Sequence, residues 1–155
     1  MFYINYIDVL DECDISKLVE LENMCFQDPW SENMFLGDLR NDNTSYLGAF
    51  IDDNILVGYI GMWEIGDTGE ITNVAVHPNY RKMGIASMLL EKLIEYCRND
   101  GFMFLNLEVR ESNIPAIKLY EKFNFKKVGL RKNYYKNPTE NAILMTNTFS
   151  EERDD

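Results

Sequence analysis

Apolar residues along this chain follow two spacings, and each spacing predicts a different kind of element. Apolar positions three or four residues apart form one face of a helix, whereas alternating or unbroken apolar runs bounded by turn residues are typical of strands. The helical spacing predicts helices over residues 15–26, 32–39, 83–99 and 114–123. The strand patterns cover residues 46–51, 55–63, 70–76, 103–109, 125–128 and 142–149. The first two helices are therefore expected before any strand, and the whole order predicts an α/β (α+β) domain with a mixed sheet.

The connection between the first two predicted helices is Asp28-Pro29-Trp30-Ser31. Ser31 is expected to cap the second helix, because its hydroxyl can accept a hydrogen bond from a free amide of the first turn. Trp30 has two possible roles, which can coexist. It can act as a hydrophobic staple for that helix, or it can form one wall of a substrate-binding mouth.

The segment between the strand at 70–76 and the helix at 83–99 is the most informative one in the sequence. It runs Pro78-Asn79-Tyr80-Arg81-Lys82-Met83-Gly84-Ile85-Ala86, so a proline-marked turn and an Arg-x-x-Gly-x-Ala sequence lead into the helix. The first amides of a helix have no partner within it, the helix dipole adds positive charge, and Gly or Ala lets a ligand approach the backbone. This junction therefore predicts a site for the pyrophosphate of a cofactor. The segment contains neither Gly-Lys-Ser/Thr nor Gly-x-Gly-x-x-Gly, which disfavours ATP and NAD.

Composition and charge limit the remaining possibilities. With 46% hydrophobic residues and no linker, the sequence predicts one domain over residues 1–149, followed by a solvated acidic tail at 150–155. The N-terminus lacks the pattern of a signal peptide and no apolar run approaches a membrane span, so a cytoplasmic protein with no membrane partner is expected. The net charge of −11 disfavours nucleic acid as a partner. It either favours a cationic substrate or merely keeps the protein soluble.

Neither the cysteines nor the histidine predict a metal site. Cys13, Cys25 and Cys97 are odd in number and widely spaced, without a Cys-x-x-Cys, so reduced and buried thiols are expected. The single histidine, His77, precedes Pro78 and is expected to be a turn residue with no catalytic role.

Residues downstream of the junction carry a resemblance to a known family. They are Leu105-Asn106-Leu107-Glu108-Val109-Arg110 and Ser112-Asn113-Ile114-Pro115-Ala116-Ile117-Lys118-Leu119-Tyr120-Glu121-Lys122-Phe123-Asn124-Phe125. With residues 71–86 and Pro29-Trp30-Ser31, they are similar to the GNAT superfamily of acetyl-CoA-dependent N-acetyltransferases. Within it the chain resembles the RimI-like type, which acetylates the N-terminal alanine of a small-subunit ribosomal protein. The resemblance covers nearly the whole chain. It implies a mixed, mostly antiparallel sheet whose central parallel strands splay apart, acetyl-CoA as cosubstrate, no metal, and a protein N-terminus as acceptor.

The resemblance also implies which residues bind acetyl-CoA. Main-chain groups of Val74 and Val76, with Ala75 between them, would pair with the pantetheine arm. The pyrophosphate would rest on the amides that open the following helix, with Arg81 nearby. These amides belong to Lys82, Met83, Gly84, Ile85, Ala86 and Ser87. Asn113 would contact the cofactor as well, although capping of the helix that follows it explains this residue equally well.

Two residues are the candidates for acid–base chemistry. Strand alternation puts Leu105, Leu107 and Val109 on one face and Glu108 on the other, in mid-strand, where a charge needs a reason. By the resemblance Glu108 is the general base; otherwise it is a solvent-facing glutamate. An α-amine of pKa about 8 is roughly one-tenth neutral at pH 7, so a modest base suits it better than a lysine of pKa ~10.4. Tyr120 matches the tyrosine that protonates the departing thiolate, and its alternative role is packing alone.

The acceptor side of the reaction also has candidate residues. Tyr134 and Tyr135 resemble the paired tyrosines of a substrate-binding hairpin; without the resemblance they are strand residues. Glu70 could attract a cationic amine or lie on a solvated face. No cysteine or serine is paired with a base, which favours direct attack over an acyl-enzyme. The competing functions are an acetyltransferase of the same fold that acts on lysine or a small amine, and a non-catalytic acyl-CoA-binding module, which would not need Glu108 or Tyr120.

Overall fold

The computed structural model describes residues 6–52 and 54–149, so the predicted acidic tail at 150–155 lies outside the described residues. The chain divides into two compact units. The first unit comprises residues 1–64 and 72–93, and the second comprises residues 65–71 and 94–155. A single domain over residues 1–149 stays a prediction.

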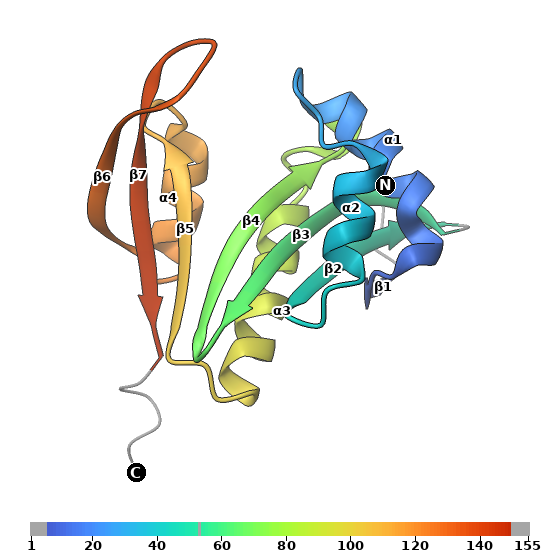
Figure 1. The fold of residues 1–155 in the computed structure, drawn as a ribbon, viewed down its shortest axis with the longest axis horizontal. Coiled ribbons are helices and arrows are strands. Elements are labelled where there is room, and N and C mark those ends of the chain that lie inside the picture. The colour runs from blue at the N-terminus through green and yellow to red at the C-terminus, as the bar shows by residue number, and fades with distance from the viewer. Residues whose placement is uncertain (1–5, 53, 150–155) are drawn as a thin grey trace. The chain divides into compact units, whose positions relative to one another are not determined.

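The elements follow the predicted order closely (Figure 1). They are β1 (Tyr6–Val9), the short 3-10 helix η1 (Glu12–Asp14), α1 (Ile15–Cys25), α2 (Glu32–Leu39), β2 (Thr44–Ile51), β3 (Ile55–Ile65), β4 (Thr68–Val76), η2 (Pro78–Tyr80), α3 (Ile85–Asn99), β5 (Phe104–Arg110), α4 (Ile114–Lys122), β6 (Lys126–Tyr135) and β7 (Glu140–Thr148). Strands β3 and β4 and helix α3 have residues in both units.

The strands form a mixed sheet with hydrogen-bonded order β1-β2-β3-β4-β5-β7-β6. The pairs β1–β2, β2–β3, β5–β7 and β6–β7 are antiparallel, and β4–β5 is parallel. The parallel register joins Thr68–Glu70 to Phe104–Asn106. The predicted fold class, a mostly antiparallel sheet with a central parallel pair and flanking helices, is confirmed.

The prediction that helices precede every strand is wrong, because β1 comes first. Its residues pair with β2 from Tyr6 opposite Phe50 to Val9 opposite Leu47. Most of the β1 side chains are exposed, so the segment shows none of the apolar alternation that marks a half-buried strand. Pairing with a neighbouring strand, rather than burial, defines this edge strand.

Strand β6 is longer than predicted for the same reason. The sequence predicted a strand at 125–128 and a connection after it, whereas β6 runs from Lys126 to Tyr135 and pairs with β7 as far as Tyr135 opposite Glu140. Eight of its ten side chains are exposed, so its sequence reads as a polar connection. Tyr134 and Tyr135 therefore lie at the end of a strand that leads into a hairpin.

The core of the first unit lies on both faces of its strands. In Figure 1, α1 and α2 cover one face of β2 and β3, and the beginning of α3 lies on the other. Tyr46 and Tyr59 stack with ring centroids 5.9 Å apart beneath Phe35 of α2. On the other face, a Cβ on Gly58 would lie 2.9 Å from the side chain of Ile85. Only glycine permits this close approach, which sets the first turn of α3 directly on the strand.

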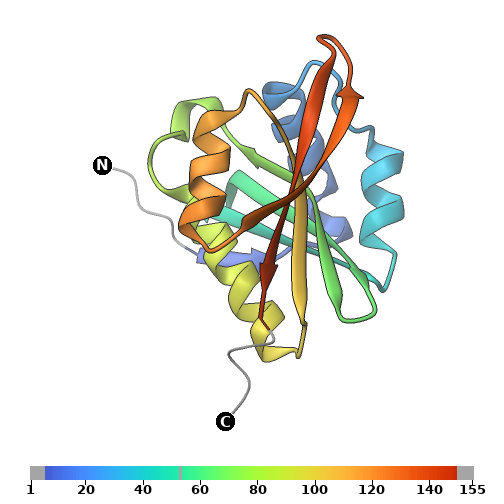
Figure 2. The same cartoon turned by 90° about the vertical axis from the view of Figure 1, so that its left-hand side faces the viewer.

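The second unit is built on β5, β7 and β6, with α4 along one face of β5 and β7 (Figures 1 and 2). Asn113 caps α4 by accepting a hydrogen bond from Ala116, and Asn124 follows its end with a φ of 73°. The buried amide of Asn147 in β7 donates to the Phe123 carbonyl at 2.8 Å. These contacts hold both ends of the helix and fix the position of Tyr120 within it.

Candidate functional site

The predicted pyrophosphate segment has the geometry of an anion-binding junction. Lys82 and Gly84 have positive φ angles of 65° and 83°, and they turn the exposed chain into the first turn of α3. Met88 makes the first intrahelical bond, to the Gly84 carbonyl at 3.0 Å, so the amides before it belong to the helix end. No heavy atom lies within 4 Å of the position of a Cβ on Gly84, and the first turn carries no acidic residue. An anionic group fits these residues.

Hydrogen bonds hold the turn before this junction in place. The His77 amide donates to the Val57 carbonyl at 2.8 Å, and the Asn79 amide donates to His77 Nδ1 at 3.1 Å. Asn79 is the second residue of η2, so the imidazole caps this short turn. The prediction of a turn role for His77 is thereby confirmed.

The carbonyl of Val76, at the end of β4, is a predicted cofactor contact that already accepts two hydrogen bonds within the protein. The Val76 carbonyl accepts from Arg81 Nε at 3.0 Å and from Cys25 Sγ at 3.4 Å. A pantetheine arm that paired with this carbonyl would have to compete with both donors. Arg81 therefore lies against the strand end, and its contact with a pyrophosphate stays a prediction.

The cysteines agree only partly with the prediction. All three cysteines are reduced thiols, and Cys97 is buried, but Cys25 is half-buried and Cys13 is exposed, so the prediction of buried thiols is wrong for these two. Burial raises the pKa of Cys25, with the nearby Arg81 acting in the opposite direction. A thiol of raised pKa is protonated at neutral pH and is a poor nucleophile, which agrees with direct attack.

Trp30 acts as the predicted hydrophobic staple. It directly precedes Ser31, which caps α2 by accepting a hydrogen bond from Met34. The Trp30 ring packs on Phe35, four residues beyond the cap, with centroids 5.5 Å apart. A role for Trp30 in substrate binding stays a prediction.

Glu22 is a buried acid in the first unit that the sequence analysis missed. Its side chain is 2% exposed, accepts from the Tyr59 hydroxyl at 2.6 Å and accepts from the Trp30 amide at 3.3 Å. Burial raises the pKa of Glu22. The missed signal was its spacing, because Glu22 lies four residues after Leu18 on the buried face of α1.

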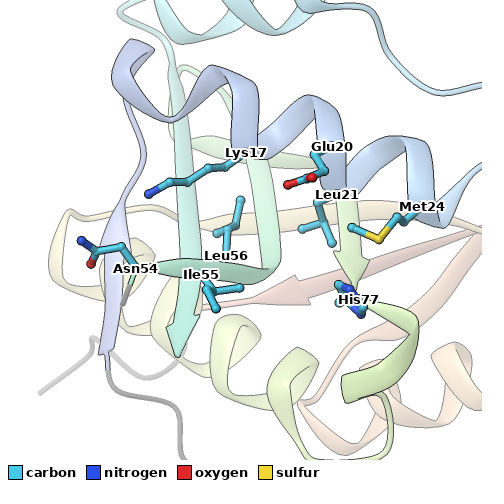
Figure 3. A pocket seen from close by; sticks show the side chains of 8 residues that line it. All are labelled: Lys17, Glu20, Leu21, Met24, Asn54, Ile55, Leu56 and His77. Carbon is cyan, nitrogen blue, oxygen red and sulfur yellow. The ribbon is translucent and has the colours of Figure 1, made fainter. Parts of the chain in front are cut away.

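The first unit also contains a cavity of about 370 Å³ (Figure 3). It lies between α1 and the start of β3, and it contains none of the residues predicted to bind cofactor or substrate. Its lining residues are Lys17, Glu20, Leu21, Met24, Asn54, Ile55, Leu56 and His77.

Glu108 lies in the second unit with charged and phenolic neighbours. The predicted alternation is confirmed, because Leu105, Leu107 and Val109 are buried while Glu108 is half-exposed on the other face of β5. Its Oε2 lies 2.7 Å from Arg131 Nε. A hydrogen bond with the Glu108 carboxylate raises the pKa of the Tyr134 phenol. The glutamate is therefore neither isolated nor purely solvent-facing.

The two other predicted tyrosines are electrostatic neighbours of each other. Tyr120 is 8% exposed, and its burial, with a smaller contribution from Tyr135, raises its pKa to about 12. Burial followed by the negative charge of Glu108 raises the pKa of Tyr135 to about 12. The ring of Tyr120 also packs edge-on against Phe125 with centroids 5.7 Å apart, so this side chain has its predicted packing contact. The fold thus brings Glu108, Tyr120, Tyr134 and Tyr135 together from β5, α4 and β6.

Arg110, at the end of β5, holds the hairpin that carries the tyrosines. Its guanidinium lies over the Tyr135 ring at 4.4 Å and donates to the Lys136 and Pro138 carbonyls at 3.1 and 3.2 Å. It also forms an ion pair with Glu140 at 3.1 Å. The sequence analysis gave no role to Arg110, because a single arginine at a strand end reveals its partners only after β6 and β7 have paired.

Glu70 has a structural role instead of lying on a solvated face. Its carboxylate accepts from Asn106 Nδ2 at 2.7 Å, and Asn106 Oδ1 accepts from the Thr146 hydroxyl at 2.7 Å. This chain of hydrogen bonds lies where the described pairing of β4 and β5 ends. Glu70 and Asn106 occupy that last register position, and their bond ties the two strands together there.

Within residues 6–52 and 54–149, no cluster of three or more metal-binding side chains occurs. In the same part of the chain, no helix is long and apolar enough to cross a membrane.

Comparison with known proteins assigns the family. The model of the acetyltransferase (GNAT) family matches residues 15–125. A protein of Bacillus subtilis described as a putative [ribosomal protein bS18]-alanine N-acetyltransferase is 36% identical over 89% of this chain and 91% of its own length. The [ribosomal protein bS18]-alanine N-acetyltransferase of Haemophilus influenzae is 37% identical, with 90% and 95% coverage. The crystal structure of the ribosomal-protein-S18-alanine N-acetyltransferase from Escherichia coli superimposes with a TM-score of 0.86 at 30% identity, covering 92% of each chain. The chain belongs to the GNAT family of acetyltransferases and is an acetyl-CoA-dependent N-acetyltransferase.

Proposed function

We propose that this enzyme transfers the acetyl group of acetyl-CoA to the N-terminal α-amine of a protein, by direct attack and in the cytoplasm. The proposed acceptor is a small-subunit ribosomal protein with alanine as its first residue. The names of the bacterial relatives, which match over nearly their full length, support this acceptor. The observation that carries the proposal is the cluster of Glu108, Tyr120 and two further tyrosines in the second unit.

The junction before α3 would hold the pyrophosphate of acetyl-CoA, whose thioester supplies the activated acetyl group. The positive φ of Gly84 and the open space around it let an anion approach the first amides of α3. Since the whole chain carries a charge of −11, these local dipoles must outweigh a repulsive overall field. Asn113 is a further proposed cofactor contact, in addition to its capping bond at the start of α4.

Glu108 is the proposed general base. Proton removal from the acceptor frees the amine lone pair for attack on the acetyl carbon, and the carboxylate can take that proton directly or through water. An ordinary carboxylate is a weak base, so the acceptor must itself supply some neutral amine. An α-amine does so at neutral pH, whereas a lysine does not.

Tyr120 is the proposed donor to the departing thiolate. With a pKa of about 12 it is protonated at neutral pH, so it is available as a hydrogen-bond donor. Complete transfer to a thiolate whose conjugate acid has a pKa of ~8.5 would cost roughly 5 kcal/mol. The phenol is therefore suited to stabilising negative charge on sulfur as the bond breaks, and less suited to carrying the full proton alone.

In the second unit, the acceptor peptide is proposed to bind along Tyr134 and Tyr135. Trp30 is a separate proposed substrate contact of the first unit. Arg110 fixes the Tyr135 ring and the hairpin carbonyls, which lowers the entropic cost of ordering these side chains on binding.

A peptide assay tests the proposed function. A peptide with a free N-terminal alanine should be acetylated by wild-type protein, and the same peptide with a blocked N-terminus should not, as measured by mass spectrometry. Glu108→Gln should lower kcat/KM for the free peptide by about 100-fold or more, most strongly at lower pH, while coenzyme A binding is kept. Glu121→Gln, on the exposed side of α4, is the matched control. Full activity of Glu108→Gln, or modification of the blocked peptide alone, would contradict the proposal.

A further inference from the structure

The carboxylate of Glu108 has a cationic partner from β6. Arg131 Nε lies 2.7 Å from Glu108 Oε2. The Tyr134 phenol lies near the same carboxylate, which raises the pKa of that phenol. The Arg131 guanidinium also lies 5.7 Å from the centre of the Tyr134 ring. The side chain of Glu108 is 30% exposed and that of Arg131 is 57% exposed, so solvent and an acceptor amine can reach the pair.

The strand register explains why arginine can make this contact. Glu108 pairs with Leu144 of β7, and Arg131 pairs with Ala142, two residues away on the same face of β7. Arg131 therefore reaches Glu108 across an entire strand, a span of about 10 Å at ordinary strand spacing. The small side chain of Ala142 leaves this path open. The contact is set by the sheet and not by neighbouring positions in the sequence.

We propose that Arg131 is a specificity-determining residue that disfavours fully cationic acceptor amines at Glu108. This inference rests on the proposed function, in which the acceptor amine meets Glu108. A bare carboxylate would attract any ammonium group, including lysine side chains and polyamines. The guanidinium offsets that attraction and repels a second cation, so an acceptor that remains cationic must displace Arg131 before it can bind. An α-amine is neutral in about one molecule in ten at pH 7 and is not excluded in this way.

Acceptor competition tests the inference. We compare kcat/KM for a peptide with a free N-terminal alanine with the values for spermidine and for an N-terminally blocked peptide that contains one lysine. Arg131→Gln should lower the preference for the α-amine by about tenfold, mainly through a lower KM for the cationic acceptors. Arg131→Lys keeps a positive charge and should retain most of the preference.

Lys132→Gln is the matched control, because it removes one positive charge from the adjacent and equally exposed position of β6. It should leave the preference unchanged. In a Glu108→Gln background, Arg131→Gln should no longer alter KM for spermidine, since the charge that it uncovers is absent. Thermal melting with coenzyme A should be alike in all variants, which separates altered selectivity from misfolding.

Two results would overturn the inference. An unchanged preference in Arg131→Gln would remove any selective role. An equal loss of kcat for every acceptor would show that Arg131 only orients Glu108. Failure of the proposed function gives a different result, namely wild-type protein that does not acetylate the alanine peptide. In that case KM for spermidine in wild type and Arg131→Gln still reports directly on whether Arg131 repels cations.

Discussion

In this enzyme, burial alters the acid–base properties of individual side chains. Tyr120 and Tyr6 carry the same phenol, yet Tyr120 is almost fully buried beside Phe125 while Tyr6 is exposed on an edge strand. Burial raises the pKa of the Tyr120 phenol to about 12, so the phenol is protonated at neutral pH. At neutral pH the site thus holds a neutral hydrogen-bond donor.

Tyr120→Phe separates the hydroxyl from the ring. The packing on Phe125 is preserved, so the melting temperature should change little, whereas kcat should fall by about 100-fold because the leaving thiolate loses its donor. The measurement is steady-state kinetics with a free N-terminal peptide. Tyr6→Phe removes a hydroxyl outside the site and should keep full activity; wild-type kcat in Tyr120→Phe would exclude the donor role.

Glu22 gives a pH dependence of stability. Burial raises its pKa in the folded state, so the neutral form is favoured there, and its stabilising contribution is complete below the unfolded value of ~4.3 and is lost as pH rises through the higher folded value. Above that pH, wild-type protein has a buried charge that Glu22→Gln lacks. The free energy of unfolding of the variant, relative to wild type, should therefore increase from pH 4 to 7 by an amount on the order of 1 kcal/mol. This increase is measured as a rise in the relative melting temperature.

The matched control for this prediction is Glu20→Gln, an exposed glutamate on the same helix. Its melting temperature should stay parallel to that of wild type over the same pH range. Parallel curves for Glu22→Gln as well would mean that Glu22 is charged at no cost in the folded protein, held by Tyr59 and the Trp30 amide.

At the scale of elements, the helices were predictable and the edge strands were not. Helix α2 carries its own signals in Ser31 and in the Trp30–Phe35 pair, which act over a few residues. Strands β1 and β6 are mostly exposed, so their sequences lack apolar alternation and their existence depends on a partner strand. The predicted junction before α3 was recognisable because its glycine, proline and helix start lie within one short segment.

Gly84→Ala tests whether the junction before α3 binds the phosphates of coenzyme A. A φ of 83° strains any residue with a Cβ, so the variant should lose about 1 kcal/mol of stability and should bind coenzyme A several-fold more weakly, because its methyl group occupies the open approach. Isothermal titration with coenzyme A measures the second effect. Gly37→Ala, in α2 and with nothing within 4 Å of its added Cβ, should instead keep affinity and stabilise the helix slightly. Equal affinity of the Gly84 variant would argue against the proposed phosphate site.

At the scale of the whole molecule, the chain carries a charge of −11 and yet is proposed to hold an anionic cosubstrate. Positive side chains gather instead on β6, where Lys126, Lys127, Arg131 and Lys132 occur in one strand of an acidic protein. Local dipoles and this uneven distribution matter more for binding than the net charge does.

Coenzyme A should stabilise the folded protein against thermal unfolding, because it binds the folded state. At a ligand concentration of 100 times Kd, mass action adds ≈2.7 kcal/mol, which for a chain of this size raises the melting temperature by roughly 5–10 °C. ATP and NAD at the same concentration should have little effect. A comparable shift with ATP would indicate a general polyphosphate site and not one for an acyl-CoA.

The sequence by itself determined the fold class, the junction before α3 and the family, because these depend on local periodicity, turn chemistry and short motifs. It also identified Glu108 and Tyr120, but only as candidates whose alternative roles were solvent exposure and packing. Tertiary structure decided their surroundings: Arg131 reaches Glu108 across β7, Arg110 holds the tyrosine hairpin, and Glu22 is buried under Tyr59. Such contacts join residues that are distant in the chain, and they depend on strand pairing and register, which no local pattern encodes. For Glu22, helical spacing could indicate burial but not its partner Tyr59.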